Sequence, residues 1–467
     1  MGRTATLTIV ALIASACAVE TNPTPTTIGT TNPATTIGTT VPATTVPATP
    51  GLTFPEAPAV PDGPLDPATT AALDKVWSGL ATGVQIDDVL ALGATGDARI
   101  AWLLADLLRF SGFAEIGEAS LQVLRELTGV TFAAGIPWVT VTDHLLGWDL
   151  PEPPGYLDYK RTLFTLIEPR WEPFFTPPSD IDYRWLSWGG VLVDDRPLGD
   201  TNPCSLSCIP ALDFPAVTDA RGGAWYPDDR FVFGVVVGGE ARAYPRNIME
   251  VHEMVNDELG GRRFGLPYCT LCGSAQLFFT DNLVGEPPVL RTSGLLSRSN
   301  KVMFDLNTYS AFDTFTGRAV TGPLREAGIS LEQGTVVTAT WGAWKEAHPE
   351  TTIVAEDGGI GRFYGLDPLG GRDDQGPIFP IGERDFRLAA QEQVVGVVTD
   401  DGVSIAFPAE SAAARLEAGG RVELAGVRLL LDGDGLRAEF GGTAVASHQA
   451  FWFAWSQFHP DTLLWEE

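Results

Sequence analysis

The sequence of 467 residues has few basic side chains. It contains 30 Lys and Arg against 59 Asp and Glu, so the formal net charge at pH 7 is −29. Only four of the basic residues are Lys. A chain of this charge repels phosphate backbones and anionic lipid headgroups. The composition therefore argues against binding to nucleic acid and against binding to a membrane surface through charge.

Long apolar runs are also absent, and no segment is apolar for long enough to span a bilayer comfortably. The longest candidate near the N-terminus, Ala5 to Ile13, follows a basic residue and leads into the sequence ASAC, which ends at Cys17. A basic start, a short apolar run and small residues before a cleavage point are typical of a secretory signal. A Cys directly after them resembles a bacterial lipobox. We expect residues 1–17 to be a lipoprotein-type signal peptide with lipidation at Cys17; the alternative is a plain secretory signal with an incidental Cys.

Several signatures of catalysis and nucleotide binding are missing. The sequence has no P-loop, no G-x-G-x-x-G after a strand, no G-x-S-x-G elbow and no H-E-x-x-H. His252-Glu253 lacks the second His of a zincin, and Gly273 stands where C-x-x-C-H haem attachment needs His. These absences argue against nucleotide use, α/β-hydrolase chemistry, zincin proteolysis and covalent haem.

What is present divides the chain into regions of different composition. Residues 18–62 are mostly Thr, Pro, Ala, Asn and Gly, which cannot bury enough apolar surface to fold, so we expect a disordered tether. Residues 63–150 have apolar side chains at helical spacing, which predicts a small all-α domain. Residues 151–195 are rich in Pro and aromatics, and we expect a linker that lies across a domain surface.

The remainder has strand-like patterns separated by Gly, Asp and Pro turns, and it contains an internal similarity. Residues 234–261 match residues 396–420, and the Trp-rich segment Trp341–Thr351 matches Trp452–Thr462. Two related units that pack together explain these matches most simply. We therefore predict an α+β fold, in which a strand-rich α+β unit is duplicated and follows the helical domain. The predicted repeats are residues 196–357, which hold a Cys motif, and the shorter 358–467.

That Cys motif is a C-x-x-C formed by Cys269 and Cys272, in which both thiolates can face one ion or each other. His252 lies upstream on a predicted helix, so a Cys/Cys/His metal set can form around one transition-metal ion, zinc or copper. Glu253 would then orient a ligand or carry a proton as the catalytic residue. A structural disulfide, metal ligation and reversible redox chemistry remain open alternatives.

A second cysteine pair, Cys204 and Cys208, is separated by three residues. In an oxidising compartment such a pair usually forms a disulfide, and we favour that interpretation.

Small polar residues follow the C-x-x-C motif or lie close before it. They suit a pocket wall with directed hydrogen bonds, and they suit turn and strand-end capping equally well. The candidate pocket residues are Asn256, Ser293, Asn300, Asp305, Thr308 and Ser310.

The order of these motifs resembles that of a bacterial family catalogued as domain of unknown function 3179. The matching segments are Ala241–Pro245, His252-Glu253, Val255–Asp257, Tyr268–Ser274, Ser293–Leu296, Ser299-Asn300, Asp305 and Phe451–Thr462. The resemblance runs from about Asp200 to the end. It implies membership of a fold family and supplies no reaction, because the family is uncharacterised. Two features depart from the family pattern: Thr270 stands where Pro is frequent, and the Cys204/Cys208 pair is not general.

We therefore expect an exported cell-envelope protein, lipid-anchored to the cell membrane on its extracytoplasmic side, with a metal-binding or thiol-redox site in the first repeat. The alternative is a non-enzymatic binding or scaffold module with structural disulfides. The sequence does not decide whether the protein is an enzyme. The expected partner is the lipid membrane, through the N-terminal anchor; nucleic acid is not expected, and nothing identifies a protein partner.

Overall fold

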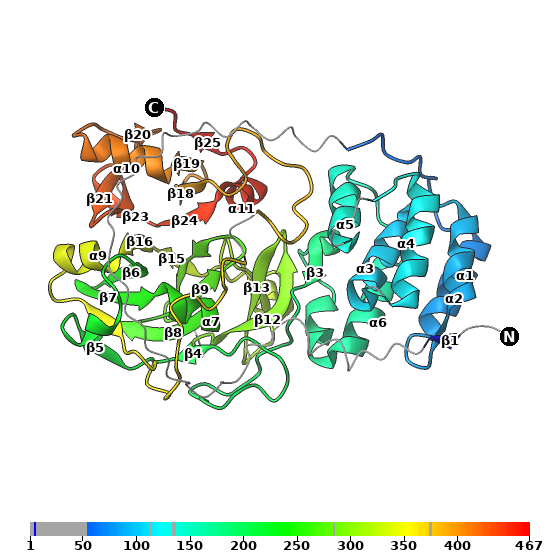
Figure 1. Ribbon diagram of the computed structural model, residues 1–467, viewed down its shortest axis with the longest axis horizontal. Coiled ribbons are helices and arrows are strands. Elements are labelled where there is room, and N and C mark those ends of the chain that lie inside the picture. Colours follow the sequence, from blue (N-terminus) through cyan, green and yellow to red (C-terminus); the bar gives the residue numbers. More distant parts are fainter. Residues whose placement is uncertain (1–3, 6–53, 113, 133–136, 284, 373–375) are drawn as a thin grey trace, which may run out of the picture.

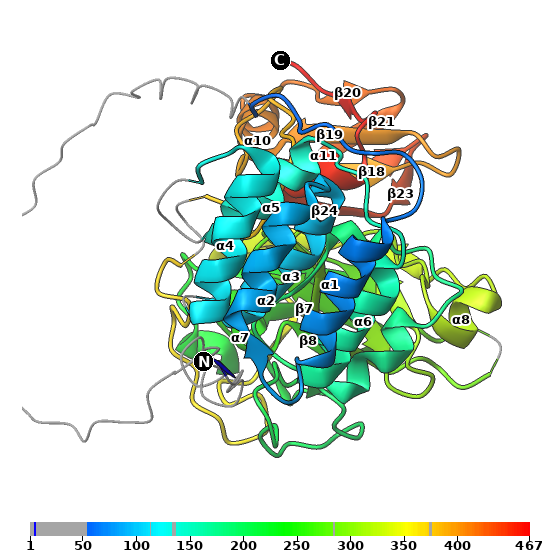
Figure 2. The ribbon, with the colours of Figure 1, turned by 90° about the vertical axis from the view of Figure 1, so that its right-hand side faces the viewer.

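The computed structural model describes residues 4–5, 54–112, 114–132, 137–283, 285–372 and 376–467. A helical region comes first and is followed by a mixed α/β region built mostly of small sheets (Figure 1). Figure 2 shows the helices stacked in front of the sheets when the molecule is viewed from the helical end. Cys17 and most of the predicted signal peptide and tether lie outside the described residues. Within the described ranges, no helix combines the length and apolar character that a membrane crossing needs.

The helical region confirms the predicted all-α character of this part of the chain. Its helices are α1 Pro67–Ser78, α2 Ile86–Ala91, α3 Ala101–Ser111, α4 Glu115–Thr128, α5 Pro137–Gly147 and α6 Tyr156–Ile167. Asp66 begins α1, because its carboxylate accepts hydrogen bonds from the N–H groups of Ala68 and Thr69. Helix α3 packs against α4, α5 and α6 and is buried on almost every side, so it forms the centre of this core. Strand β1 (Thr4–Ala5) pairs with β2 (Val84–Gln85) at its edge.

The stretch 151–195 differs from the expected surface linker. It contains α6, 3₁₀ turns at Pro169–Phe175 and Tyr183–Trp185, and β3 (Leu186–Trp188), which pairs with β12 (Leu290–Ser297). Its aromatic side chains fill the core between helices and sheets rather than lying on a surface. Some of the Pro residues stand before α6 or at the start of the first 3₁₀ turn, where a missing N–H costs little. Pro173 lies inside that turn, and Pro177 and Pro178 follow it.

The last residues of the predicted tether also touch the folded part. Trp148, just after α5, donates a hydrogen bond from Nε1 to the carbonyl of Pro55 at 2.7 Å. The ring of Phe54 meets the edge of His144 at a centroid distance of 5.2 Å. Residues 54–62 therefore run along the helical region without regular secondary structure.

Two sheets of the α/β region have the same strand order. We call them the first unit and the second unit. The first unit contains β6 (Phe231–Val237), β7 (Glu240–Pro245), α7 (Arg246–His252), β16 (Val337–Thr340), α9 (Trp341–Ala347) and β17 (Thr352–Val354). The second contains β18 (Gln393–Val398), β19 (Ser404–Pro408), α10 (Ala409–Glu417), β24 (Ser447–Phe451), α11 (Trp452–Phe458) and β25 (Leu463–Leu464). Their orders are β16-β6-β7-β17 and β24-β18-β19-β25.

Strand directions and registers also agree between the units. In each, the two central strands are antiparallel, and the last strand runs parallel to its neighbour. Gly234 lies opposite Ala243 in the first unit, and Gly396 lies opposite Ala406 in the second. The first unit has one additional strand, β5 (Val217–Asp219), beside β17.

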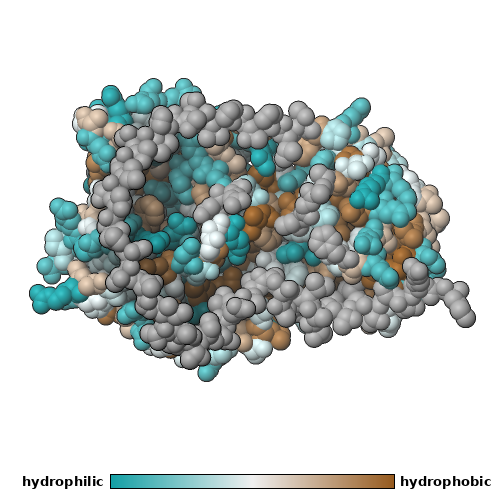
Figure 3. Space-filling model, in the orientation of Figure 1, coloured by the Kyte–Doolittle hydropathy of each residue, from teal (hydrophilic) through white to brown (hydrophobic). Residues whose placement is uncertain are grey.

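The units differ in what is inserted between their first helix and third strand. The first unit's insertion contains β8 (Met254–Leu259), β9 (Arg262–Cys269), β10 (Ser274–Ala275), β11 (Leu277–Phe279), β12, β13 (Asn300–Asp305), β14 (Ala311–Asp313), α8 (Gly322–Glu326) and β15 (Glu332–Gly334). It forms the sheets β15-β11-β9-β8-β4, with β4 at Leu212–Asp213, and β14-β13-β12-β3. The second unit's insertion is a single sheet of β20 (Glu423–Leu424), β21 (Val427–Asp432), β22 (Gly435–Phe440) and β23 (Thr443–Val445). Hydrophilic residues gather over this upper part of the molecule (Figure 3).

Candidate functional site

The C-x-x-C motif occupies a tight turn at the end of β9. Cys269 closes the strand, and Ser274 pairs back onto it as the first residue of β10. Gly273 has φ +58°, and a Cβ at this position would lie 2.8 Å from Nε2 of Gln393, so both backbone conformation and space require glycine. Both cysteines are free thiols and both are buried. The turn therefore holds two reduced sulfurs together in the interior.

A second turn, between β12 and β13, lies against the sulfurs. Its two residues, Arg298 and Ser299, have φ of +52° and +60°. The carbonyl of Ser299 accepts a hydrogen bond from Sγ of Cys272 at 3.4 Å, and Sγ of Cys269 lies 3.9 Å from the same oxygen. Positive φ is unfavourable for residues other than Gly and Asn, and such conformations gather at functional sites. Here the surroundings hold the turn in place, since the Ser299 hydroxyl donates to the carbonyl of Pro380.

An ion pair stands beside Cys269. Glu253 ends α7 with φ +51°, at a position that Gly usually takes. Lys301 Nζ donates to the Glu253 carbonyl at 2.6 Å and lies 2.9 Å from its Oε2. Thr270 Oγ1 donates to Glu253 Oε1 at 3.3 Å. The pair is largely shielded from solvent, with side-chain exposures of 5% for Lys301 and 13% for Glu253.

The two thiols have opposite tendencies to ionise. Burial and the Glu253 carboxylate raise the pKa of Cys269, but the hydrogen bond from Cys272, the backbone N–H of Lys301 and the Lys301 charge bring that pKa below its usual value. Burial, and then the neighbouring Cys269, raise the pKa of Cys272 well above its usual value. When the pair of thiols loses its first proton, the negative charge therefore lies on Cys269. The Cys272 thiol stabilises this thiolate.

A small cavity of about 80 Å³ reaches this sulfur. Cys269, Glu253 and Lys301 contribute its reactive and charged wall, while Leu295, Val302 and Phe379 contribute apolar surface. A cavity of this size admits only a few non-hydrogen atoms. Chemistry at Cys269 is therefore restricted to small reagents or to the tip of a larger one.

His252 does not join the cysteines. Its Nδ1 lies 2.6 Å from the carbonyl oxygen of Pro210, which can only accept, so Nδ1 carries the proton. Its Nε2 then accepts from the hydroxyl of Tyr364 at 2.6 Å. Burial lowers the pKa of His252 to about 4, which keeps the ring neutral. The predicted Cys/Cys/His set is therefore not assembled, because both ring nitrogens have other partners and Glu253 takes the place at the thiols.

The predicted pocket residues separate into two groups. Ser293 lines the small cavity, and Asn300 lines a larger one described below. Asn256 instead links strands, since its side chain donates to Asp213 and accepts from the Leu290 N–H. The remaining three stabilise the turn after β13: Thr308 donates to Asp305, Thr308 donates to Ser310, and the Thr308 N–H also donates to Asp305. The contacts of Asp305, Thr308 and Ser310 therefore agree with the capping interpretation, whereas Asn256 bridges neighbouring strands.

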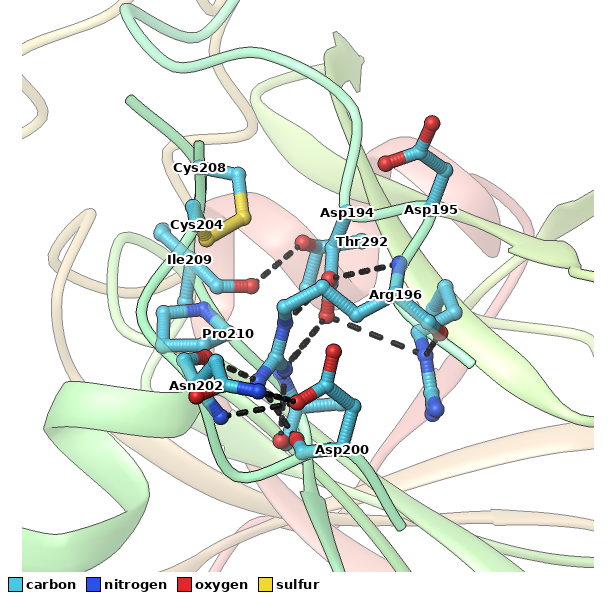
Figure 4. The surroundings of a disulfide bond; sticks show 12 residues. Asp194, Asp195, Arg196, Asp200, Asn202, Cys204, Cys208, Ile209, Pro210 and Thr292 are labelled. Atoms are coloured by element: carbon cyan, nitrogen blue, oxygen red, sulfur yellow. Dashed lines mark hydrogen bonds and ion pairs between the residues drawn. A yellow bond between two sulfur atoms is a disulfide. The ribbon is translucent and has the colours of Figure 1, made fainter. Parts of the chain in front are cut away.

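The Cys204–Cys208 disulfide is present, which confirms the prediction for this pair (Figure 4). Asp194 lies beside it, and the ligand atoms of these three residues fall within 4.8 Å of one another. Within the described ranges this is the one group of three metal-ligand side chains so placed. A metal binds the thiolate form of Cys, so this group is available only when the disulfide is reduced. Asp194 is also occupied, since Arg196 Nε and the Ala211 N–H donate to it at 2.7 and 2.8 Å.

Sequence reasoning did not identify Lys301 or Asp194. Both stand in ordinary strand or loop contexts without a local motif, and only the fold brings them to cysteines that are distant in sequence. The one sequence signal for Lys301 is a single Lys among the apolar residues of a predicted strand.

Comparison with known proteins agrees with the motifs. A family model described as "Protein of unknown function (DUF3179)" matches residues 207–433. No curated protein and no solved structure matches the chain. The matched range includes the C-x-x-C turn, Glu253 and Lys301, and it confirms the resemblance over these residues, while the Phe451–Thr462 segment lies beyond the match. Residues 207–433 of the chain thus match the DUF3179 family of proteins of unknown function.

Proposed function

We propose that Cys269 and Cys272 form a redox-active dithiol that a small oxidant reaches through the 80 Å³ cavity. The observation that carries this proposal is the pairing of two free thiols of opposite acidity, with the more acidic sulfur at the cavity wall. Reactive thiols depend on a thiolate that positive charge and hydrogen-bond donors favour. Lys301 supplies both, through its ammonium and its backbone N–H.

The chemistry follows from this arrangement. With a hydroperoxide as oxidant, the Cys269 thiolate attacks the distal oxygen, the O–O bond breaks, and the leaving oxygen takes a proton. Cys269 becomes a sulfenic acid. Cys272 then attacks that sulfur, water leaves, and a Cys269–Cys272 disulfide forms. Two electrons pass from the dithiol to the peroxide, and an external thiol must reduce the disulfide to complete the cycle.

Metal binding is a second candidate, and here the geometry favours copper over zinc. Two thiolates suit a soft ion such as Cu(I). Structural zinc sites use four ligands and catalytic sites three, but no third ligand-type side chain of a described residue joins Cys269 and Cys272. A non-enzymatic scaffold, with a Cys269–Cys272 disulfide as a staple, is the remaining alternative.

Thiol titration combined with metal analysis of the purified full chain separates these functions. Besides Cys17, we expect two titratable thiols in the denatured protein, which hydrogen peroxide converts to one disulfide that a dithiol reductant reverses. Cys269→Ser should abolish the reaction, whereas Cys272→Ser should stop it at the sulfenic acid. Cys204→Ser/Cys208→Ser is the matched control and should leave the peroxide reaction unchanged. A disulfide already present and resistant to reduction would contradict the redox proposal, and a stoichiometric ion lost with Cys269→Ser would support metal binding.

We also propose that the chain is exported and anchored to the cell membrane through a lipid on Cys17. The signal-like start supports this, and so does the Cys204–Cys208 disulfide, because disulfides persist in oxidising compartments. Cell fractionation tests the proposal: Cys17→Ser should move the protein from the membrane fraction to a soluble extracytoplasmic fraction. Equal membrane retention of the variant would contradict the lipid anchor.

We further infer that the two units are duplicates of one ancestral α+β unit, with repeats near residues 196–357 and 358–467. The common strand order and the matched registers of Gly234 and Gly396 support this inference. If the units share one architecture, equivalent substitutions in them should have equivalent consequences for stability.

A further inference from the structure

A second, much larger cavity lies where the helical region meets the two units. Its volume is about 770 Å³, within the range of sites for small organic ligands. Trp102 of α3 and Leu146 of α5 form one side, the β12–β13 turn forms another, and Arg384 and the end of α11 close a third. Three parts of the chain that are distant in sequence therefore contribute to one polar cavity.

Two arginines of this cavity have no acidic partner. The guanidinium of Arg298 lies over the Trp185 ring, 4.6 Å from its centroid, and burial lowers the pKa of Arg298. Arg384 has a buried Nε without a hydrogen-bond partner. Neither arginine forms an ion pair with a described residue. In a chain with a net charge of −29, two unpaired guanidinium groups in one cavity are unusual.

The acidic residues around the cavity bond to other groups, although the charges of Asp182 and Asp313 act on Arg298, and the charge of Arg384 acts on Asp143. Asp149 and Asp182 both pair with Arg184, at 2.6 and 2.7 Å, Asp180 pairs with Arg325 at 2.5 Å, and Asp385 pairs with Arg387 at 2.6 Å. Asp313 accepts backbone hydrogen bonds from Phe315 and Thr316, and Glu383 is exposed to solvent. Arg298 and Arg384 are therefore two guanidinium groups of the cavity to which no carboxylate of a described residue is bonded directly.

Unsatisfied amides line the same cavity. Asn300 is 1% exposed, and neither its Nδ2 nor its Oδ1 has a hydrogen-bond partner. Oε1 of Gln457 is also buried without a partner. An unsatisfied buried polar group costs about 1–3 kcal/mol, so native proteins retain few of them without a reason. Two such side chains beside two unpaired arginines indicate a site built for a polar ligand.

We propose that this cavity binds a small organic anion, whose carboxylate or phosphate group lies between the guanidinium groups of Arg298 and Arg384. Asn300 and Gln457 bond to the ligand's hydroxyl or amide groups, and Trp102, Leu146 and Phe312 pack against its carbon skeleton. Arginine suits this role because its planar fork binds either anion with two hydrogen bonds. The proposal does not depend on thiol chemistry at Cys269.

Calorimetric titration of the full chain tests the proposal, with citrate as the carboxylate probe, inorganic phosphate as the phosphate probe, and chloride at equal ionic strength as the blank. We expect one of the two probes to bind one site per chain and to raise the unfolding temperature, and the stronger probe identifies the anionic group. Arg298→Met and Arg384→Met should each weaken that binding about tenfold or more, because each removes a charged hydrogen-bond donor.

Arg421→Met is the matched control, since Arg421 is an exposed arginine that pairs with Glu423 outside the cavity. It should leave binding unchanged. Thermal unfolding without probe shows whether each variant folds, and Arg298→Lys, which keeps the charge, should bind more tightly than Arg298→Met. Absence of binding by both probes, or equal affinity in the parent and both Met variants, would overturn the proposal.

Discussion

The first and second units share a frame, by which we mean their common strand order and the Gly, Trp, His and Thr residues that pack together on it. They differ in chemistry. In each, a tryptophan of the second helix packs on a strand glycine and donates a hydrogen bond to a threonine. Trp344 Nε1 donates to Thr351 at 3.0 Å, and Trp455 Nε1 donates to Thr462 at 3.0 Å. A histidine ring packs at a tilt against each tryptophan, with ring centroids 4.0 Å apart in the first unit and 4.2 Å apart in the second.

The thiols and their partners belong only to the first unit's insertion. Cys269 stands on β9, Cys272 in the turn between β9 and β10, and Lys301 on β13. The single sheet inserted in the second unit has no counterpart for these elements. The frame therefore explains why Trp, His and Thr recur along the chain, and the insertion explains why the cysteines do not. Repeated residues indicate architecture here, while unrepeated ones indicate the site.

Removing the frame tryptophans is expected to have the largest effect. Trp344→Ala and Trp455→Ala each empty a fully buried site and should destabilise the protein by about 3–5 kcal/mol. Denaturant unfolding of both variants measures this. Trp→Phe controls, which keep most of the volume, should lose much less. If one tryptophan proved nearly dispensable, the two frames would not be equivalent.

The strand glycines offer a smaller and sharper comparison. A Cβ at Gly234 would lie 2.4 Å from the Trp344 ring, and one at Gly396 would lie 2.0 Å from the Trp455 ring. Gly234→Ala and Gly396→Ala should therefore each cost about 1–3 kcal/mol through overpacking. Gly365→Ala, with open space at its Cβ, is the control and should change stability little. If the two Gly→Ala variants lost unequal amounts of unfolding free energy in the same assay, the Trp344 and Trp455 rings would be held differently in the two units.

Much of this frame is predictable from sequence, because the Gly, Trp, His and Thr recur in order. Helical spacing likewise predicts the helices before residue 150. Helix α6 was not predicted, because flanking prolines dominate the local composition, although they stand outside the helix. The burial of its aromatic side chains depends on contacts with β12 and β13, which no local pattern reports.

The site was predictable only in part. The C-x-x-C motif is visible in the sequence, and so is the neighbouring His252-Glu253. Which of the two reaches the thiols depends on the positive φ of Glu253, and Glu gives no sign of a conformation that Gly usually adopts. Lys301 reaches Cys269 only because β12 and β13 fold back over β9, so its role depends on tertiary structure.

The histidines at equivalent positions differ in their partners, which predicts a difference in acid stability. His348 Nε2 lies 2.6 Å from Asp432 Oδ1, a carboxylate of the second unit's insertion. His459 lacks an ion-pair partner among the described residues, and burial lowers its pKa to about 4. The neutral form of His459 therefore contributes stability above the unfolded-state pKa near 6.5, and that stability is lost as the pH falls toward 4.

His459→Asn should therefore reduce the loss of stability between pH 7 and pH 5 by at most about 2 kcal/mol. Unfolding curves at both pH values measure this difference. The control is His348→Asn, the equivalent substitution in the first unit, which replaces a ring that contacts the carboxylate of Asp432. His448 lies near His459 and has a pKa lowered to about 3, so some acid sensitivity should remain in either variant. Identical pH dependence in the parent and His459→Asn would contradict the assignment.

The smallest expected effect concerns the site and separates it from its frame. Lys301→Met removes the charge and side-chain donor beside Glu253 and should raise the pKa of the Cys269 thiol, because the Lys301 charge favours the thiolate. Alkylation below that pKa should then slow about tenfold, because only the thiolate reacts.

A double variant, Lys301→Met with Glu253→Gln, avoids an unpaired buried carboxylate. Because Glu253 itself raises that pKa, the double variant should shift the thiol pKa less than Lys301→Met alone. The matched control is Lys345→Met, which breaks a surface ion pair with Asp228 in the first unit and should leave the alkylation rate unchanged. If Lys301→Met and Lys345→Met reacted alike, the acidity of Cys269 would arise from the turn and Cys272 alone, and Lys301 would serve only to hold Glu253 in place.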